Sequence, residues 1–471
     1  MDIPGMRSVL KKATASLSLI VVPIIGLIFV TVVDPPNALA VPSYARQTGL
    51  PCSGCHYAPP ELNPAGRRFK LLGYVDRGDD TKTVKADGSK SRAALDLLAS
   101  LPLSVMFEAS FTNTNSPVPT TQNGNLQVPQ DMSLFLAGAW TSHVGSFLQV
   151  TYETQSDHFT SDNTDIRYAN KTTWSGKELV YGLDLNNNPT VEDLWNTTPA
   201  WGYPWIASNV APTPNASPII NGVLAQDVAG FGGYAMWDNH LYLNVDLYRS
   251  QHVGGSEPNP GVGANVNIVG VAPYWRLAWQ ESRGPTQFEI GTYGIHVKST
   301  NNAINSGVDD VYDSYTDWAF DMQLDQTLFR KDVVSLRGTF IHENSNLASS
   351  AAVPTPAGPL ASPGGHHLNT FMPNVEYHYG TRLSGTFGWF DTSGTPDLLL
   401  YPSGAISGNL NGDPRSAGYI ANLSYWPWQN LQLAAQYTGY TRFNGGSTNY
   451  DGAGRNASSN NTVYLDAKFL F

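Results

Sequence analysis

A two-residue alternation of apolar and polar side chains runs through the chain from about residue 100 to its last residue. In the segment TVYLDAKFLF, every second residue from Val463 to Phe471 is apolar, and Tyr464, Asp466 and Lys468 lie between them. Successive side chains of a β-strand point to opposite faces, so this period predicts a strand with one apolar face. The same period occurs in LYLNVDLY (241–248), DWAFDMQLD (317–325) and LQLAAQYTGY (431–440).

A soluble β-sandwich would also alternate, but the links between the predicted strands favour a membrane barrel. Outer-membrane barrels have short periplasmic turns and long outer loops. Here, long polar segments such as the one from about Asn186 to Ile220 alternate with short links. The short links include SHVGS (142–146), WDNH (237–240), FRKD (329–332) and WPWQN (426–430).

Aromatic residues support the same interpretation. Tyr425, Trp426 and Trp428 gather beside one predicted turn, as expected of the aromatic girdle at a membrane interface. Phe471 ends the apolar face of the last predicted strand, where outer-membrane proteins carry an aromatic assembly signal. We therefore predict an all-β fold, an outer-membrane barrel of about 16 strands over residues 100–471, with both barrel ends on the periplasmic side.

Composition excludes other classes. Only 14% of residues are charged, and the chain is rich in aromatic residues, which argues against disorder. The formal net charge of −11 argues against a nucleic-acid partner. No apolar run after the N-terminal region is long enough for a membrane-spanning helix, which needs about 20 residues.

The first forty residues have the pattern of a signal peptide. Arg7, Lys11 and Lys12 precede an apolar run over 17–33, and Ala38-Leu39-Ala40 forms a small-residue cleavage site. A retained membrane anchor is the alternative, and either outcome exports the chain. We expect a signal peptide over residues 1–40.

The pentapeptide CSGCH holds the only two cysteines of the chain, Cys52 and Cys55, followed directly by His56. C-x-x-C-H is the attachment pattern of a c-type haem, in which two thiols form thioethers and the histidine ligates iron. A zinc site would need about four ligands, and a thioredoxin-like motif would need a βαβ context. A simple disulfide is the remaining alternative. We predict one covalent haem c in a cytochrome segment over 41–99, with His56 as the metal-binding and catalytic residue.

A second axial ligand is missing near the motif, because no further His or Met occurs between His56 and Ser104. The barrel must then supply it from a side chain that faces the lumen. Strand parity turns Met106 and Glu108 inward on the first predicted strand. The same parity turns Met372, Glu376 and His378 inward in FMPNVEYHYG, and Met236 is a further candidate. Met106 is the first choice for this ligand.

Residues 41–74, VPSYARQTGLPCSGCHYAPPELNPAGRRFKLLGY, resemble the N-terminal signature of the fused monohaem cytochrome–porin iron oxidases of Fe(II)-oxidising bacteria. Residues 45–49 (ARQTG) match the lead of that signature, and 66–74 (GRRFKLLGY) match its tail; Ala65 departs from it. The segment NNNPTVEDLWNTTPAWGYPW (186–205) is similar to the long loop of that family.

The resemblance implies an iron(II) oxidoreductase in the outer membrane. Such a protein takes electrons from extracellular Fe(II) and passes them through its haem, in or beneath the lumen, to a periplasmic cytochrome c or copper protein. It also implies roles for Arg46, Arg67 and Lys70, which would pair with haem propionates or with lumen carboxylates. The carboxylates considered are Asp317, Asp321 and Asp325.

Two alternatives to the Fe(II) oxidase remain at this point. One is a conduit of the same build that serves another electron donor or runs in the reductive direction. The other is a diffusion porin in which the N-terminal segment is only a plug. No compact Fe(II) site stands out, and the loop carboxylates Asp309, Asp310 and Asp313 are interpreted as a solvated face.

Overall fold

The structure is a computed structural model of the 471-residue chain. The predicted signal peptide lies outside the described residues, and the division into residues 41–99 and 100–471 stays a prediction. The residues that the structure describes are 43–75, 83–84, 97–98, 102–119, 121–251, 266–300, 311–352 and 359–471.

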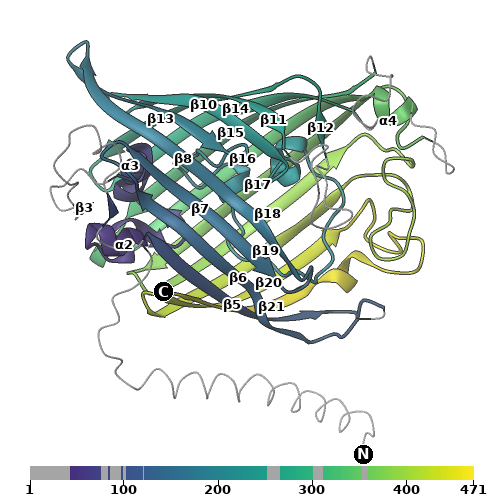
Figure 1. Ribbon diagram of the computed structural model, residues 1–471. Helices are drawn as coiled ribbons and strands as arrows, with labels where there is room; N and C mark the ends of the chain where they lie inside the picture. Colours follow the sequence, from purple (N-terminus) through teal and green to yellow (C-terminus); the bar gives the residue numbers. More distant parts are fainter. Residues whose placement is uncertain are drawn as a thin grey trace, which may run out of the picture. The chain divides into compact units, whose positions relative to one another are not determined.

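Sixteen long strands, each antiparallel to its neighbours, close into a barrel in the described part of the chain (Figure 1), which confirms the predicted fold class. The ring closes where β21 pairs with β5, with Leu470 opposite Met106. A two-residue strand, β12 (Asn267–Ile268), extends the pairing beside β14. Closure pairs each of these sixteen described strands on both sides, as a barrel in lipid requires. The long strands are β5 (Leu103–Thr114), β6 (Asn125–Ala139), β7 (Val144–Glu153), β8 (His158–Trp174), β9 (Lys177–Asn186), β10 (Val228–Trp237), β11 (Leu241–Ser250), β13 (Ala272–Arg283), β14 (Thr286–Thr300), β15 (Asp313–Thr327), β16 (Val333–Leu347), β17 (Gly365–Tyr379), β18 (Leu383–Gly394), β19 (Ser416–Trp428), β20 (Leu431–Arg442) and β21 (Thr462–Leu470).

The predicted alternation separates an apolar outer face from a polar interior. On β15, Phe320 is 54% exposed, whereas its neighbour Asp321 is 3% exposed. On β11, the leucines and the valine point outward, while Tyr242, Asn244 and Asp246 are buried. An apolar outer band around a polar lumen is the arrangement of outer-membrane barrels.

The short links form tight turns at one end of the barrel, which we call the short-turn end. They join β6 to β7, β10 to β11, β15 to β16 and β19 to β20, as the sequence predicts.

Phe471 lies at this end, where its backbone exchanges hydrogen bonds of 2.7 and 2.9 Å with Val105. The predicted aromatic girdle holds only in part, because Tyr425 faces outward and Trp426 is buried inside the barrel.

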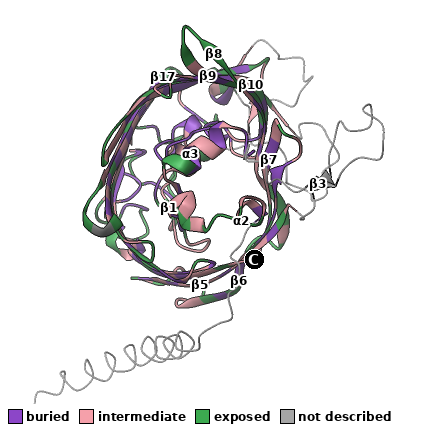
Figure 2. Cartoon of the chain, turned by 90° about the vertical axis from the view of Figure 1, so that its left-hand side faces the viewer, coloured by how far each residue is buried: buried purple, intermediate pink, exposed green. Residues whose placement is uncertain are grey.

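Residues 43–75, which we call the N-terminal segment, fold inside the ring of strands (Figure 2). Ser43 N donates to Ser104 Oγ at 2.6 Å, and the Tyr44 hydroxyl donates to the Ser146 carbonyl at 2.6 Å. These bonds fix the segment to the barrel wall near the short-turn end. Its elements are α2 (Ser43–Thr48), the 3₁₀ turn η1 (Cys52–Gly54), β1 (His56–Ala58), β2 (Glu61–Leu62) and α3 (Pro64–Leu71).

Residues 187–227, between β9 and β10, form a second element of the lumen, which we call the inward loop. The sequence predicts a long polar outer loop here, and that prediction is wrong. Every residue from Pro189 to Thr198 is buried, because the loop turns into the barrel and packs against the N-terminal segment. The loop contains two short helical turns, η2 (Pro199–Trp201) and η3 (Ile219–Val223).

The remaining described elements are short. None of the helices in the described ranges is long and apolar enough to cross a membrane. The short elements are β3 (Thr83–Val84), which pairs with β4 (Leu97–Leu98), the helix α4 (Ala348–Ala352), and the 3₁₀ turns η4 (Phe329–Lys331) and η5 (Ala457–Asn460).

Candidate functional site

The CSGCH loop is fixed by the residue that begins the following helix. Asn63 caps α3, with its side-chain oxygen accepting from the backbone N–H groups of Ala65 and Gly66, both at 3.0 Å. Its amide nitrogen donates to the carbonyls of Ser53 and Gly54, and its backbone N–H donates to the Cys55 carbonyl at 2.9 Å. One asparagine therefore positions both the helix and the loop between the two cysteines.

Gly66 is required by a close approach between α3 and the cysteine loop. A Cβ atom at this position would lie 2.1 Å from the carbonyl oxygen of Cys55. The glycine of the GRRFKLLGY pattern thus lets the helix backbone contact the CSGCH loop directly, which any larger residue would prevent.

His56 is held in one tautomer. Its Nδ1 lies 3.2 Å from the Glu61 carbonyl oxygen, which only accepts hydrogen bonds, so Nδ1 carries the proton and Nε2 is left as the ligand atom. Metal-ligating histidines commonly donate their other ring N–H to a carbonyl in this way. Burial lowers the pKa of His56 to about 4, which keeps the imidazole neutral, as iron ligation needs.

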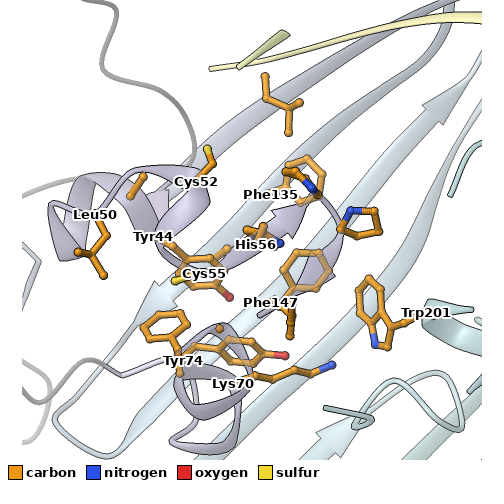
Figure 3. Close-up of a pocket in the computed structure, with 18 of the residues that line it drawn as sticks. Tyr44, Leu50, Cys52, Cys55, His56, Lys70, Tyr74, Phe135, Phe147 and Trp201 are labelled. Carbon is orange, nitrogen blue, oxygen red and sulfur yellow. The ribbon is translucent and has the colours of Figure 1, made fainter. Parts of the chain in front are cut away.

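Cys52, Cys55 and His56 all line one cavity of about 350 Å³ inside the barrel (Figure 3). Its walls are mostly apolar and aromatic, and they come from the N-terminal segment, the barrel strands and the inward loop. The Cys52 thiol donates to the Gln429 carbonyl at 3.5 Å, in the turn between β19 and β20, so the cavity lies at the short-turn end. Its aromatic residues are Tyr44, Phe69, Tyr74, Phe135, Phe147, Trp195, Trp201, Trp205 and Trp426.

Two lysines bring positive charge to this apolar cavity, Lys70 from α3 and Lys468 from β21. Lys70 reaches across towards Trp201, with its Nζ 4.7 Å from the ring centre, and donates to the carbonyls of Val191 and Asp193 (Figure 3). Burial, with the charge of Arg167, lowers the pKa of Lys70 to about 7. An anionic group in the cavity would restore the charged form of this lysine.

Among the histidine and methionine candidates for the second axial ligand, Met106 is the one that lines this cavity. His378 lies instead with its Nε2 3.1 Å from Glu61 Oε2, in a buried group that includes Glu376 and Arg337. Met372 lines a separate cavity, and Met236 is packed in a buried apolar cluster. Glu108 points inward as predicted, but it bonds to Lys468 and Tyr464.

Of the three basic residues, Arg67 is the one that pairs with a predicted lumen carboxylate in the described structure, and pairing with haem propionates stays a prediction. Arg67 Nη2 lies 2.5 Å from Asp325 Oδ2 in a buried ion pair. Arg46 donates to the Leu103 carbonyl, and Lys70 binds the inward loop. The remaining two lumen carboxylates hold that loop instead, since Asp317 accepts from the Ile220 N–H and Asp321 accepts from Thr197.

A buried arginine fastens the inward loop to the wall. Arg276 on β13 forms two hydrogen bonds to Asp321, of 2.7 and 3.0 Å, and ion pairs with Glu289 at 3.2 Å and with Asp193 of the loop at 3.1 Å. Its guanidinium also lies 5.3 Å from the centre of the Trp195 ring. Because Asp193 and Trp195 line the cavity, this cluster sets the position of one cavity wall.

Sequence reasoning missed the contribution of the inward loop to the cavity. The signal was present, because DLWNTTPAWGYPW (193–205) carries three tryptophans and is too apolar for a solvated loop. Lys468 and Trp426 were also missed, although strand parity turns both inward.

Among the loop carboxylates, Asp309 and Asp310 lie outside the described residues. Asp313 is buried at the start of β15, where it accepts from Ser350, so a solvated role for it is wrong.

No protein-family model and no curated protein matches this sequence. Its structural neighbours are outer-membrane porins and channels. Pseudomonas putida OprB aligns with a TM-score of 0.48 and 11% identity, over 78% of this chain and 93% of its own. The channel DcaP of Acinetobacter baumannii aligns with a TM-score of 0.45 and 14% identity, over 82% of this chain and 100% of its own. An anion-selective porin from Comamonas acidovorans aligns with a TM-score of 0.42 and 12% identity, over 79% of this chain and 99% of its own. This likeness concerns the fold alone.

The residues around the cavity fit a covalently attached haem. Both cysteines and the histidine of the motif line the same apolar space, and a methionine from the barrel lines it too. The histidine presents Nε2 in a fixed tautomer. Two lysines of the cavity, Lys70 and Lys468, could pair with the anionic propionates of a haem. This donor set, two thiols, an imidazole and a thioether, is that of a c-type cytochrome.

Proposed function

We propose that this protein is an outer-membrane monohaem cytochrome that oxidises extracellular Fe(II) and delivers the electron to a periplasmic carrier. The observation that carries the proposal is the meeting of Cys52, Cys55, His56 and Met106 around one cavity inside a closed barrel. A bound haem c supplies a one-electron redox centre whose potential depends on its axial ligands and its surroundings.

The chain's own groups have distinct tasks in this proposal. The two cysteines hold the cofactor covalently, and His56 offers Nε2 because its Nδ1 is engaged by the Glu61 carbonyl. Trp195 and Trp201 from the inward loop close the cavity with apolar surface and exclude water. Lys70 provides a basic group at the cavity wall, which an anionic haem substituent would hold in its charged form.

The position of the cavity supports a periplasmic electron acceptor, a cytochrome c or a copper protein. It lies at the short-turn end of the barrel, and short turns face the periplasm in barrels of this class. Fe(II) as donor is supported by the resemblance of residues 41–74 to the cytochrome–porin iron oxidases. It is also supported by a lumen lined with carboxylates, which attract cations.

Rapid mixing with Fe(II) tests this function. The haem-loaded full chain in detergent is expected to gain the absorption spectrum of a reduced c-type cytochrome. The variant Cys52→Ala/Cys55→Ala serves as the control and should show no such change. If the loaded protein stays oxidised with Fe(II) but is reduced by dithionite, the Fe(II) oxidase proposal fails, and a conduit for another donor or in the reductive direction replaces it.

Replacing Met106 tests the second axial ligand. Met106→Ala is expected to remove the thioether–iron charge-transfer band of the oxidised protein and to lower its reduction potential, because methionine ligation raises the potential. Met372→Ala, which alters a methionine of the other cavity, should leave both unchanged. An unaltered band in Met106→Ala would eliminate this residue as the ligand.

A diffusion porin is the second candidate, favoured by one specific observation. A further cavity of about 310 Å³ lies between the inward loop and strands β17 to β21, so the described lumen is not filled throughout. Conductance in planar bilayers tests this function. A steady open-channel current from native protein that does not stain for haem would favour the porin over the cytochrome.

A further inference from the structure

Three carboxylates that take no part in the proposed haem site meet at the contact between the inward loop and the barrel wall. Asp184 lies on β9, Asp246 on β11 and Glu192 in the loop, and one oxygen of each lies within 4.8 Å of the other two. Their exposed fractions are 2%, 0% and 1%, respectively. Three such groups cannot all remain charged in a buried space unless positive charge joins them.

Direct pairing with a basic side chain does not balance these carboxylates in the described part of the chain. Among the described residues, no lysine or arginine forms an ion pair with any of the three carboxylates. Arg167 acts on them electrostatically, but it is tied to Asp165, with Nε 2.9 Å from Oδ2. Protons or a cation must therefore balance this group.

Unsatisfied oxygens point to a cation. Within the described chain, Oε2 of Glu192 and Oδ2 of Asp246 are buried without a hydrogen-bond donor, although Asn244 Nδ2 donates to Asp184 and to the other oxygen of Asp246. The other oxygens of the two acids are satisfied, since Tyr248 donates to Glu192 Oε1 at 3.0 Å and Asn244 Nδ2 lies 3.3 Å from Asp246 Oδ1. Buried oxygens of this kind are rare in native proteins unless water or an ion completes them.

The backbone of β10 leaves room for this arrangement. A Cβ atom on Gly232 would lie 1.6 Å from Asp246 Oδ1, so the carboxylate of Asp246 occupies space that is open only because residue 232 is glycine.

The distances between the carboxylate oxygens also suit a bound ion. Oxygens on opposite sides of a cation with bonds of about 2.0–2.4 Å lie roughly 4–5 Å apart.

We propose that Asp184, Glu192 and Asp246 bind a hard divalent cation, and that Fe(II), the donor of the proposed function, is the cation they take. The identity of the ion rests on the proposed function, whereas the site itself does not. Carboxylate and carbonyl oxygens favour Mg²⁺, Ca²⁺ and Mn²⁺, and the same ligands bind Fe²⁺ more strongly than Mn²⁺. Glu192 directly precedes Asp193 and Leu194 of the cavity wall, so consecutive residues of the inward loop connect the proposed cation site to the cavity.

Mn(II) is a suitable probe, because its free-ion electron paramagnetic resonance signal falls when the ion binds. The full-length protein is expected to bind one Mn(II), and Fe(II) added under anaerobic conditions should displace it. Asp246→Asn should weaken binding by about tenfold or more, since even an outer-shell partner of a metal ligand is worth that much. Glu192→Gln should weaken Mn(II) binding as well, and because Glu192 lies in the inward loop, this variant leaves the barrel strands unaltered.

Glu289→Gln is the matched control, because Glu289 is a buried lumen carboxylate that Arg276 already neutralises. It should retain Mn(II) binding. Binding that is absent from the native protein, or unchanged in both Asp246→Asn and Glu192→Gln, would overturn the site. Reduction by Fe(II) without such binding leaves the proposed function intact and removes this inference. Mn(II) binding that Fe(II) does not displace keeps the site and removes Fe(II) as its cation, whereas displacement without haem reduction removes only the proposed function.

Discussion

Replacement of both Cys52 and Cys55 by alanine is expected to abolish haem staining of the denatured protein while the barrel still forms. Haem stays with a denatured chain only through covalent bonds, and these are the only two thiols of the sequence. The barrel should persist, because its closure depends on strand pairing from β5 to β21 and not on the cysteine loop. Staining after denaturing electrophoresis measures the first effect, and the strand content in circular dichroism measures the second.

Single variants sharpen this result. Cys52→Ala and Cys55→Ala each retain one thiol and should stain more weakly than the native chain. His56→Ala keeps both thiols, so it should still stain while its absorption spectrum changes. A native chain that does not stain, after expression with haem attachment enzymes, would refute the cytochrome proposal and leave the porin.

Arg276→Leu is expected to destabilise the folded barrel by about 3–5 kcal/mol, the usual cost of leaving buried charges without their partner. Arg276 is 0% exposed and neutralises Asp193, Asp321 and Glu289, so its loss leaves three carboxylates facing one another. The inward loop should detach from β13, because Asp193 belongs to the loop. Urea unfolding in lipid vesicles measures the stability, and planar-bilayer conductance, expected to rise, measures the release of the loop.

Arg415→Leu is the control for this prediction. Arg415 pairs with Asp391 at 3.0 Å, but its side chain is 46% exposed, and exposed ion pairs contribute about 0–1 kcal/mol. Equal stability losses in the two variants would contradict the assigned role of Arg276. A destabilised Arg276→Leu whose conductance stays at the native level would show that other contacts suffice to hold the loop.

The barrel was predictable because lipid and lumen impose opposite demands on neighbouring residues of every strand. On β11, four apolar residues face outward and Tyr242, Asn244, Asp246 and Tyr248 face inward, as the period requires. The same parity places Met106 in the lumen. The C-x-x-C-H motif identifies three further cavity residues, Cys52, Cys55 and His56. Trp426 and Lys468 also follow the parity of their strands into the lumen, although the cluster of aromatic residues at the turn predicts Trp426 in the membrane girdle beside Tyr425.

The path of the inward loop could not be predicted in the same way. Its burial depends on partners far away in the sequence, such as Arg276 for Asp193 and Glu343 for the backbone of Ile219. Nothing local in the loop specifies those contacts, although its tryptophans indicate that it avoids water. The carboxylate cluster was missed for the same reason, since Asp184, Glu192 and Asp246 come from three separate elements.

The cavity at the cysteine motif spans the seam at which the barrel closes. Met106 of the first barrel strand and Leu470 of the last strand are paired neighbours across that seam, and both line the cavity. Lys468 of the same last strand also lines it. The last barrel strand therefore supplies part of the wall around a motif that precedes the first barrel strand. Because both strands of the closing pair contribute to this wall, the cavity is complete only when β21 has paired with β5.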